Sequence, residues 1–140
     1  MNRVLVIDDE VGVLNHLMVL LAQSEQYEVE TLSDSRKAFE VIAAGHFDVI
    51  LLDMAMPGVS GLEVLRHVRE HYPEIGVVIL SGVEDIRLAV ETMKLGAHDY
   101  LLKPVEEHDL FKALARAVSP RANISENQGP GGGGKPESQR

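Results

Sequence analysis

Residues suited to phosphoryl chemistry follow four short segments of this sequence that we predict to be strands. Asp8 and Asp9 follow Val4–Ile7, Asp53 follows Phe47–Leu52, Ser81 follows Val77–Leu80, and Lys103 follows Ala97–Leu102. The apolar runs in the first three of these segments are typical of strands that are buried on both faces of a parallel sheet. Because parallel strands all end at one edge of the sheet, we expect the three carboxylates, the hydroxyl and the ammonium to converge there.

Such a cluster would favour one kind of chemistry. Three carboxylates repel one another unless a cation neutralises them. Mg²⁺ is a hard cation that takes carboxylate oxygens together with phosphate oxygens and water. A lysine adds a point charge suited to a phosphoryl group, and an aspartate beside it can act as a nucleophile for phosphorus. Each segment taken alone has a plainer explanation, such as a helix cap, a turn residue or a surface lysine. The prediction of an aspartyl-phosphate site therefore depends on their coincidence at successive strand ends.

The elements that must position these residues alternate between strand and helix. The predicted strands are these four segments and Tyr27–Leu32, whose polar alternation suits an edge strand. The predicted helices are Val11–Ser24, a second from Ser33 to Gly45, a third from Ser60 to before Pro73, a fourth from Glu84 to Gly96, and a fifth from about Glu106 to Val118. Five strand–helix repeats predict a parallel sheet covered on both faces.

Helical spacing also predicts which side chains face the core. Leu14, Leu17, Met18 and Leu21 are expected to form the inner face of the first helix, which Val13 and Leu20 widen. Ile86, Ala89, Val90 and Met93 are expected to form that of the fourth. Ser60 and Glu63 have the spacing of a capping box at the start of the third helix.

Length and composition exclude several classes of protein. The chain has 140 residues, which suits one domain, and no cysteine, which excludes disulfide and thiol chemistry. No apolar run approaches the roughly 18 residues that a membrane span needs, and we expect a cytoplasmic protein without a signal peptide. The net charge is −9. An acidic surface repels nucleic acid phosphates, so we expect no direct nucleic acid binding by this segment.

The composition changes near Pro120. We predict a single domain over residues 1–119, and a flexible Gly/Pro-rich linker or tail over residues 120–140, which contain the run GPGGGG.

The motifs at the strand ends make this sequence resemble the receiver domain of bacterial response regulators, the CheY-like family. The resemblance covers roughly Asn2–Val118. It rests on Asp8-Asp9, LLDMAMPGVSG around Asp53, Ser81-Gly82, Gly96-Ala97, Asp99-Tyr100 and Leu102-Lys103-Pro104. It implies an α/β fold of the flavodoxin-like (βα)5 type, a doubly wound parallel sheet with strand order 2-1-3-4-5.

The resemblance also implies a role for each site residue. Asp53 would accept a phosphoryl group from a phosphohistidine on a sensor histidine kinase or a phosphotransfer protein. Asp9, Asp53 and the backbone carbonyl of Ala55 would bind Mg²⁺ directly, with Asp8 acting through water.

Further implied roles concern the phosphoryl group and the switch. Lys103 would pair with Asp53 and then with the phosphoryl group, and the Lys103-Pro104 peptide bond would be cis. Ser81 would hydrogen-bond a phosphoryl oxygen, and Tyr100 would change rotamer as Ser81 moves inward. This motion would bias a surface made of the fourth helix, fifth strand and fifth helix, here about Glu84–Val118.

The expected partners follow from the same resemblance. The stretch SGVEDIRLAVETMKLGAHDYLLKPV is similar to receivers of the NtrC class, which regulate transcription through further domains. The linker fits either a regulator with an output domain beyond the C-terminus or a single-domain regulator. A homodimer could form through the surface of the fourth helix, fifth strand and fifth helix. The chain would not be an enzyme for an external substrate, because it would only gain and lose its own phosphoryl group.

Two other functions compete with this interpretation. A phosphohydrolase of the haloacid dehalogenase type also uses an aspartate nucleophile, but it needs a second aspartate two residues later, where this chain has Ala55. A receiver-like binding module that never takes phosphate typically loses an acidic residue or the lysine, and this chain keeps Asp8, Asp9, Asp53 and Lys103.

Overall fold

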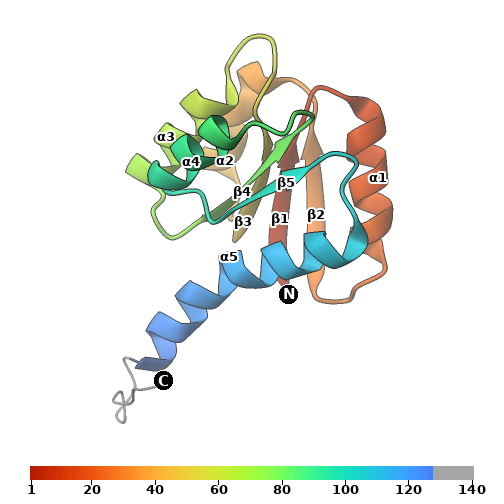
Figure 1. The fold of residues 1–140 in the computed structure, drawn as a ribbon. Helices are drawn as coiled ribbons and strands as arrows, with labels where there is room; N and C mark the ends of the chain where they lie inside the picture. Colours follow the sequence, from red (N-terminus) through yellow and green to blue (C-terminus); the bar gives the residue numbers. More distant parts are fainter. Residues whose placement is uncertain (128–140) are drawn as a thin grey trace.

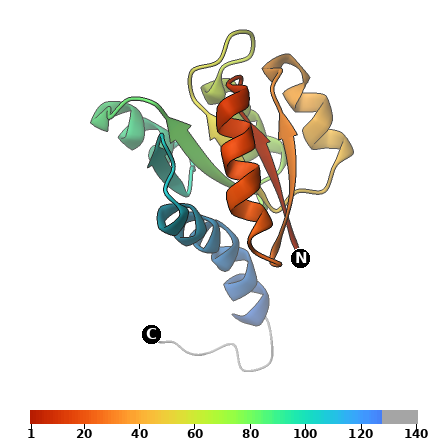
Figure 2. The same ribbon diagram turned by 90° about the vertical axis from the view of Figure 1, so that its right-hand side faces the viewer.

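A five-stranded parallel sheet lies between two layers of helices (Figures 1 and 2). The computed structural model describes the backbone of residues 1–127 and the side chains of residues 1–118. The elements in chain order are β1 (Asn2–Ile7), α1 (Val11–Ala22), β2 (Tyr27–Leu32), a 3-10 turn (Ser35–Lys37), α2 (Ala38–Ala44), β3 (Val49–Asp53), α3 (Gly61–His71), β4 (Gly76–Ser81), α4 (Ile86–Lys94), β5 (Asp99–Leu102) and α5 (Glu107–Asn127). The strand order β2-β1-β3-β4-β5, with every neighbouring pair parallel, confirms the predicted flavodoxin-like fold.

Alternate residues of each central strand enter two separate cores. Val4 and Val6 of β1 pack with α1 and α5 on one face, whereas Leu5 and Ile7 pack with the α2, α3 and α4 layer on the other. All four side chains have no exposed surface. A continuous apolar run is what a strand buried on both faces requires, and for this reason the sequence identified the central strands well.

Local sequence signals explain several helix ends. The capping box at Ser60 is present, because its hydroxyl accepts from the Glu63 amide and the Glu63 carboxylate accepts from the Ser60 amide. Asp85 caps α4 by accepting a hydrogen bond from the Leu88 amide. Gly45 follows the last residue of α2, as expected.

The predicted inner face of α4 is wrong. Ile86, Val90 and Met93 are 78%, 46% and 44% exposed, whereas Thr92 is fully buried. Helix α4 carries a second apolar stripe through Leu88 and Leu95, and this stripe contacts the core instead. Burial of Thr92 is tolerated because its hydroxyl donates to the Ala89 carbonyl, 2.9 Å away.

A smaller error of the same kind occurs in α1. Met18 is 41% exposed although its spacing matched the inner face, whereas Leu20 is buried beside Leu14, Leu17 and Leu21, as expected.

Helix α5 is longer than predicted and crosses the expected domain boundary. It continues to Asn127, beyond both Val118 and Pro120, and extends past the end of the sheet (Figure 1). A proline has a backbone φ close to the helical value, so it weakens a helix without always ending it. The predicted end of the fifth helix at Val118 is therefore wrong, whereas the flexible linker stays a prediction, and its residues 128–140 lie outside the described residues. No helix in the described part is long and apolar enough to cross a membrane.

Candidate functional site

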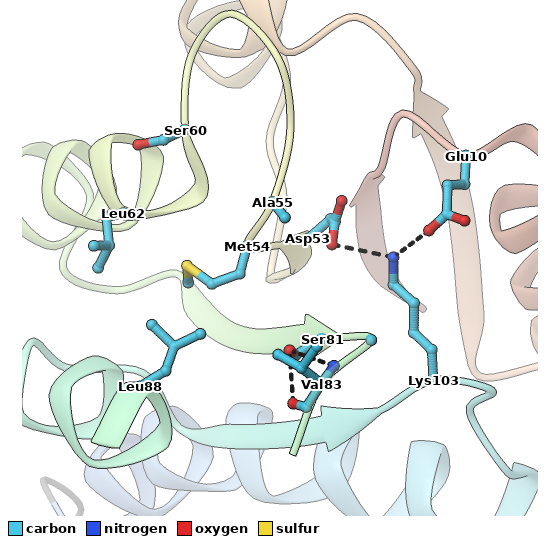
Figure 3. A pocket seen from close by; sticks show the side chains of 11 residues that line it. Glu10, Asp53, Met54, Ala55, Ser60, Leu62, Ser81, Val83, Leu88 and Lys103 are labelled. Carbon is cyan, nitrogen blue, oxygen red and sulfur yellow. Dashed lines mark hydrogen bonds and ion pairs between the residues drawn. The ribbon is translucent and has the colours of Figure 1, made fainter. Parts of the chain in front are cut away.

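The carboxyl ends of β1, β3, β4 and β5 surround a pocket of about 370 Å³ at one edge of the sheet. The parallel register aligns Asp53 with Leu80 and Ser81 with Leu102, which brings the last residues of three strands to the same level. Figure 3 shows Asp53 and Lys103 pointing toward each other at one end of this pocket, and Met54, Leu62 and Leu88 lining the other end.

The Lys103 ammonium connects three carboxylates. Its Nζ lies 2.8 Å from Asp8 Oδ2, 2.8 Å from Glu10 Oε1 and 3.1 Å from Asp53 Oδ1 (Figure 3 draws the last two). The contact with Glu10 has the geometry of a directed hydrogen bond. Lys103 follows β5, and its amide donates to the Ser81 carbonyl, which fixes the lysine beside the end of β4. The lysine thus offsets the repulsion that the clustered carboxylates would otherwise create.

Three carboxylates form a candidate cation site. Oxygens of Asp8, Asp9 and Asp53 lie within 4.8 Å of one another, with Asp8 and Asp53 buried and Asp9 exposed. Asp8 Oδ2 is buried and, among residues 1–118, no donor satisfies it with hydrogen-bond geometry, although Lys103 lies within ion-pair distance. A set of hard oxygen ligands with one buried oxygen left over fits a divalent cation such as Mg²⁺.

Burial and charge shift the pKa values of the central pair. Burial raises the pKa of Asp53 to about 6, and the negative charge of Asp8 adds to the rise, while Lys103 opposes it. Burial acts to lower the pKa of Lys103, but the carboxylates of Asp8, Glu10 and Asp53 outweigh it and raise this pKa above its ordinary value. Lys103 therefore stays charged at neutral pH, whereas the Asp53 carboxylate is ionised only at a cost.

Ser81 and Tyr100 meet at one backbone carbonyl. The Ser81 hydroxyl donates to the Val83 carbonyl at 3.0 Å and accepts from the Val83 amide at 3.2 Å. The Tyr100 hydroxyl donates to the same carbonyl at 3.2 Å. Ser81 lines the pocket together with Asp53, yet within the described residues its hydroxyl bonds to its own loop and not to that carboxylate.

The structure thus brings most of the predicted site residues together. Asp8, Asp9, Asp53 and Lys103 form one cluster, and Ser81 and Ala55 line the same pocket. The Lys103–Pro104 peptide bond is cis, and Tyr100 is linked to the site by its hydrogen bond to the Val83 carbonyl.

Sequence reasoning missed two contributors to the site, the side chain of Glu10 and the carbonyl of Val83. Glu10 directly follows the acidic pair, but an acid at the start of a predicted helix also suits a helix cap, so its position does not single it out. A backbone carbonyl leaves no trace in the sequence.

A buried serine holds the loop that follows Asp53. The Ser35 hydroxyl donates to the Pro57 carbonyl at 2.8 Å and accepts from the Val59 amide at 3.1 Å. These bonds join the two sides of the turn in which Gly58 has a φ of 85°, a value that favours glycine. The loop carrying Ala55 is therefore fixed from the side of α2.

Replacing Gly61 with alanine is expected to distort the backbone at Asp53. A Cβ there would lie 2.5 Å from the Asp53 carbonyl oxygen and 2.8 Å from the Met54 Cα, and neither atom can move aside easily. We expect the free energy of unfolding in urea to fall by about 1–3 kcal/mol. Gly12→Ala is the matched control, because no atom lies within 4 Å of its added Cβ, and it should stabilise α1. Equal stability of the two variants would contradict the close approach.

The fold and the site together define a class of protein, an α/β domain of the CheY-like kind with an acidic pocket and a lysine at the carboxyl edge of its sheet. The family model of the response regulator receiver domain matches residues 4–115, and the chain belongs to this family.

Individual relatives agree with this assignment. The regulatory protein AtoC of Escherichia coli is 32% identical over 84% of this chain, and the C4-dicarboxylate transport transcriptional regulatory protein DctD of Pseudomonas aeruginosa is 33% identical over 91%. A receiver domain from Clostridium thermocellum is 35% identical with a TM-score of 0.81, over 89% of this chain and 99% of that one.

The chain spans 25% and 27% of the lengths of the AtoC and DctD relatives. These matches favour the receiver domain over the haloacid dehalogenase-type hydrolase. They also support the similarity to regulators of the NtrC class that the sequence around α4 and β5 indicated.

Proposed function

We propose that Asp53 of this receiver domain accepts a phosphoryl group in a two-component system. The observation that carries the proposal is the position of the Lys103 ammonium, 3.1 Å from Asp53 and 2.8 Å from the buried Asp8. This arrangement supports a nucleophilic carboxylate with a fixed cation beside it, at the edge of the sheet where α/β folds bind ligands.

The chemistry is a phosphoryl transfer to an oxygen of Asp53. The Asp53 carboxylate attacks phosphorus, an acyl-phosphate P–O bond forms, and the P–N bond to the donor imidazole breaks with its electron pair left on nitrogen. Mg²⁺, when bound, would neutralise charge on the phosphoryl oxygens. Asp9, Asp53 and the Ala55 carbonyl would hold it directly, with Asp8 acting through water.

The remaining site residues receive the transferred group. Lys103 donates to a phosphoryl oxygen once the group is bound to Asp53. Ser81 donates its hydroxyl to another phosphoryl oxygen, which requires it to leave the Val83 carbonyl. Water later hydrolyses the acyl phosphate and restores the carboxylate, so the domain returns to its starting state without turning over an external substrate.

The change at Ser81 is the start of the proposed switch. Ser81 and Tyr100 donate to the same carbonyl, so movement of the loop at Val83 alters both hydrogen bonds. The loop leads into α4, whose apolar side chains Ile86, Val90 and Met93 are exposed. We propose that the α4-β5-α5 surface is the output of the switch and contacts a second copy of the domain or an output domain.

The donor and the downstream role complete the proposal. A phosphohistidine on a sensor histidine kinase or a phosphotransfer protein supplies the phosphoryl group, in the cytoplasm. Several relatives are described as transcriptional regulatory proteins, which supports control of transcription through domains outside this chain.

Incubation with acetyl phosphate tests the proposal. With Mg²⁺ present, intact mass spectrometry should detect one added phosphoryl group per chain, and the addition should fall at least tenfold when EDTA removes the metal, since neutralisation of the phosphoryl charge supplies much of the rate. Absence of any added phosphate on the folded protein with Mg²⁺ would contradict the proposed function.

A further inference from the structure

We propose that Glu10 is a positioning residue that holds Lys103 before the phosphoryl group arrives and slows its arrival. The inference rests on the proposed function and extends it to a residue outside the predicted site. Glu10 lines the same pocket as Asp53 and Lys103, and its carboxylate accepts a hydrogen bond from the Lys103 ammonium at 2.8 Å (Figure 3).

The helix that begins beside Glu10 does not explain its side chain. Glu10 occupies the N-cap position of α1, where Ser, Thr, Asp or Asn usually accepts a hydrogen bond from the first turn. Its side chain makes no such bond and turns toward Lys103, 93 residues later in the chain. Its amide donates to Asp8 Oδ1 at 2.9 Å, which fixes the backbone at the edge of the acidic cluster. The side chain is therefore directed at the site and not at the helix.

Transfer of a phosphoryl group requires Lys103 to change partners. An ammonium has three protons, and three carboxylates already lie within 3.1 Å of it. Asp8 is fully buried, so withdrawing the lysine from it would leave a charge without solvent. Glu10 is 62% exposed and can exchange the lysine for water at small cost. Glu10 is thus the partner that Lys103 releases.

The negative charge of Glu10 slows phosphoryl uptake, as does its hydrogen bond to Lys103. An incoming phosphodonor is an anion, and it must approach a pocket mouth that already carries an exposed carboxylate. Repulsion between these two negative charges raises the free energy of the encounter, and salt screens the repulsion. Both effects slow phosphoryl uptake and neither is needed for the fold.

The test is the rate of phosphoryl uptake by Glu10→Gln. With acetyl phosphate and Mg²⁺ in excess, followed by intact mass over time, we expect this variant to react about fivefold faster than the wild type at low salt. The difference should shrink as sodium chloride screens the charge, a response that a purely structural role would not produce. Glu10→Asp, which keeps the charge, should react at a rate closer to that of the wild type.

Glu84→Gln is the matched control. Glu84 is an exposed acid in the loop after β4, and its replacement removes the same charge as Glu10→Gln. Urea unfolding should show that each variant is folded. If the wild type reacts but Glu10→Gln is no faster than Glu84→Gln, or is slower, the role of Glu10 is refuted and the proposed function stands. If the folded wild type takes no phosphate, the proposed function fails, and the inference fails with it.

Discussion

Asn in place of Asp53 is expected to abolish phosphoryl uptake from acetyl phosphate, because a carboxamide is not a nucleophile for phosphorus under these conditions. The substitution keeps the size of the side chain within the buried end of β3, so the sheet should be unaffected. Intact mass spectrometry checks the result. Asp109→Asn, a change at an exposed aspartate in the first turn of α5, should take up phosphate like the wild type. Equal uptake by Asp53→Asn and the wild type would contradict the assignment.

The same variant should reveal how much the ionised Asp53 carboxylate lowers the free energy of unfolding of the metal-free protein. The folded pKa of Asp53 is about 6, against an ordinary value of 3.8. Between these pH values the folded state keeps a proton that the unfolded chain has lost, so the free energy of unfolding of the wild type falls as pH rises through this window.

Asp53→Asn lacks this titration and should gain stability relative to the wild type by about 1–3 kcal/mol between pH 4 and pH 7. Urea unfolding in EDTA at several pH values measures the gain. Mg²⁺ should stabilise the wild type more than the variant, because the variant lacks one of the ligands. A stability difference that does not change with pH would show that Asp53 is not held against its ionisation.

Replacing Lys103 with methionine is expected to give the second large effect. The change leaves Asp8 and Asp53 buried without the ammonium that lies within 3.1 Å of both. Removing one partner of a buried ion pair typically costs about 3–5 kcal/mol, and we expect a fall in the free energy of unfolding near the lower end of that range, since water reaches the pocket. Phosphoryl uptake should also slow by at least about tenfold, since the transferred group loses its fixed positive charge.

The pH dependence and a control separate this effect from a general loss of charge. Protonation of the carboxylates at low pH relieves their repulsion, so the deficit of Lys103→Met should shrink as pH falls from 7 toward 4. Lys94→Met, at an exposed lysine in the last turn of α4, should change stability and uptake little. If the two lysine variants were equally stable at pH 7, Lys103 would not be the counter-ion of the cluster.

The central sheet and most of the acidic site could be predicted from the sequence. Strands such as Val4–Ile7 are buried on both faces, and an unbroken apolar run can satisfy few other environments. Once the strands are known, parallel order brings their last residues to one edge, where Asp8 and Asp53 follow the paired strands β1 and β3. Lys103 follows β5, which is separated from β3 by β4, so topology places it at the same edge and its long side chain completes the contact.

Predictions that depended on fine geometry were less successful. Helix α4 has two apolar stripes, and only the packed structure distinguishes the exposed Ile86 from the inward Leu88. The length of α5 could not be predicted, because Pro120 permits more than one outcome. The contact between Glu10 and Lys103 joins residues that are far apart in the chain and depends on the rotamers of two long side chains.

The proposed switch could be predicted in part. The resemblance to receiver domains implied that Ser81 and Tyr100 act together, but the sequence did not indicate what connects them. The structure shows that both hydroxyls donate to the Val83 carbonyl, at 3.0 and 3.2 Å. In this state Ser81 is engaged with its own loop, and its transfer to a phosphoryl oxygen is the first motion that the proposed mechanism requires.

Identification of the residue that carries the phosphoryl group tests the central claim most directly. The wild-type chain is treated with acetyl phosphate and Mg²⁺, the acyl phosphate is reduced with borohydride, and the peptides are sequenced by mass spectrometry. We predict that reduction converts Asp53, and no other aspartate, to homoserine. Modification at a different residue, with Asp53 recovered unchanged from phosphorylated protein, would contradict the account.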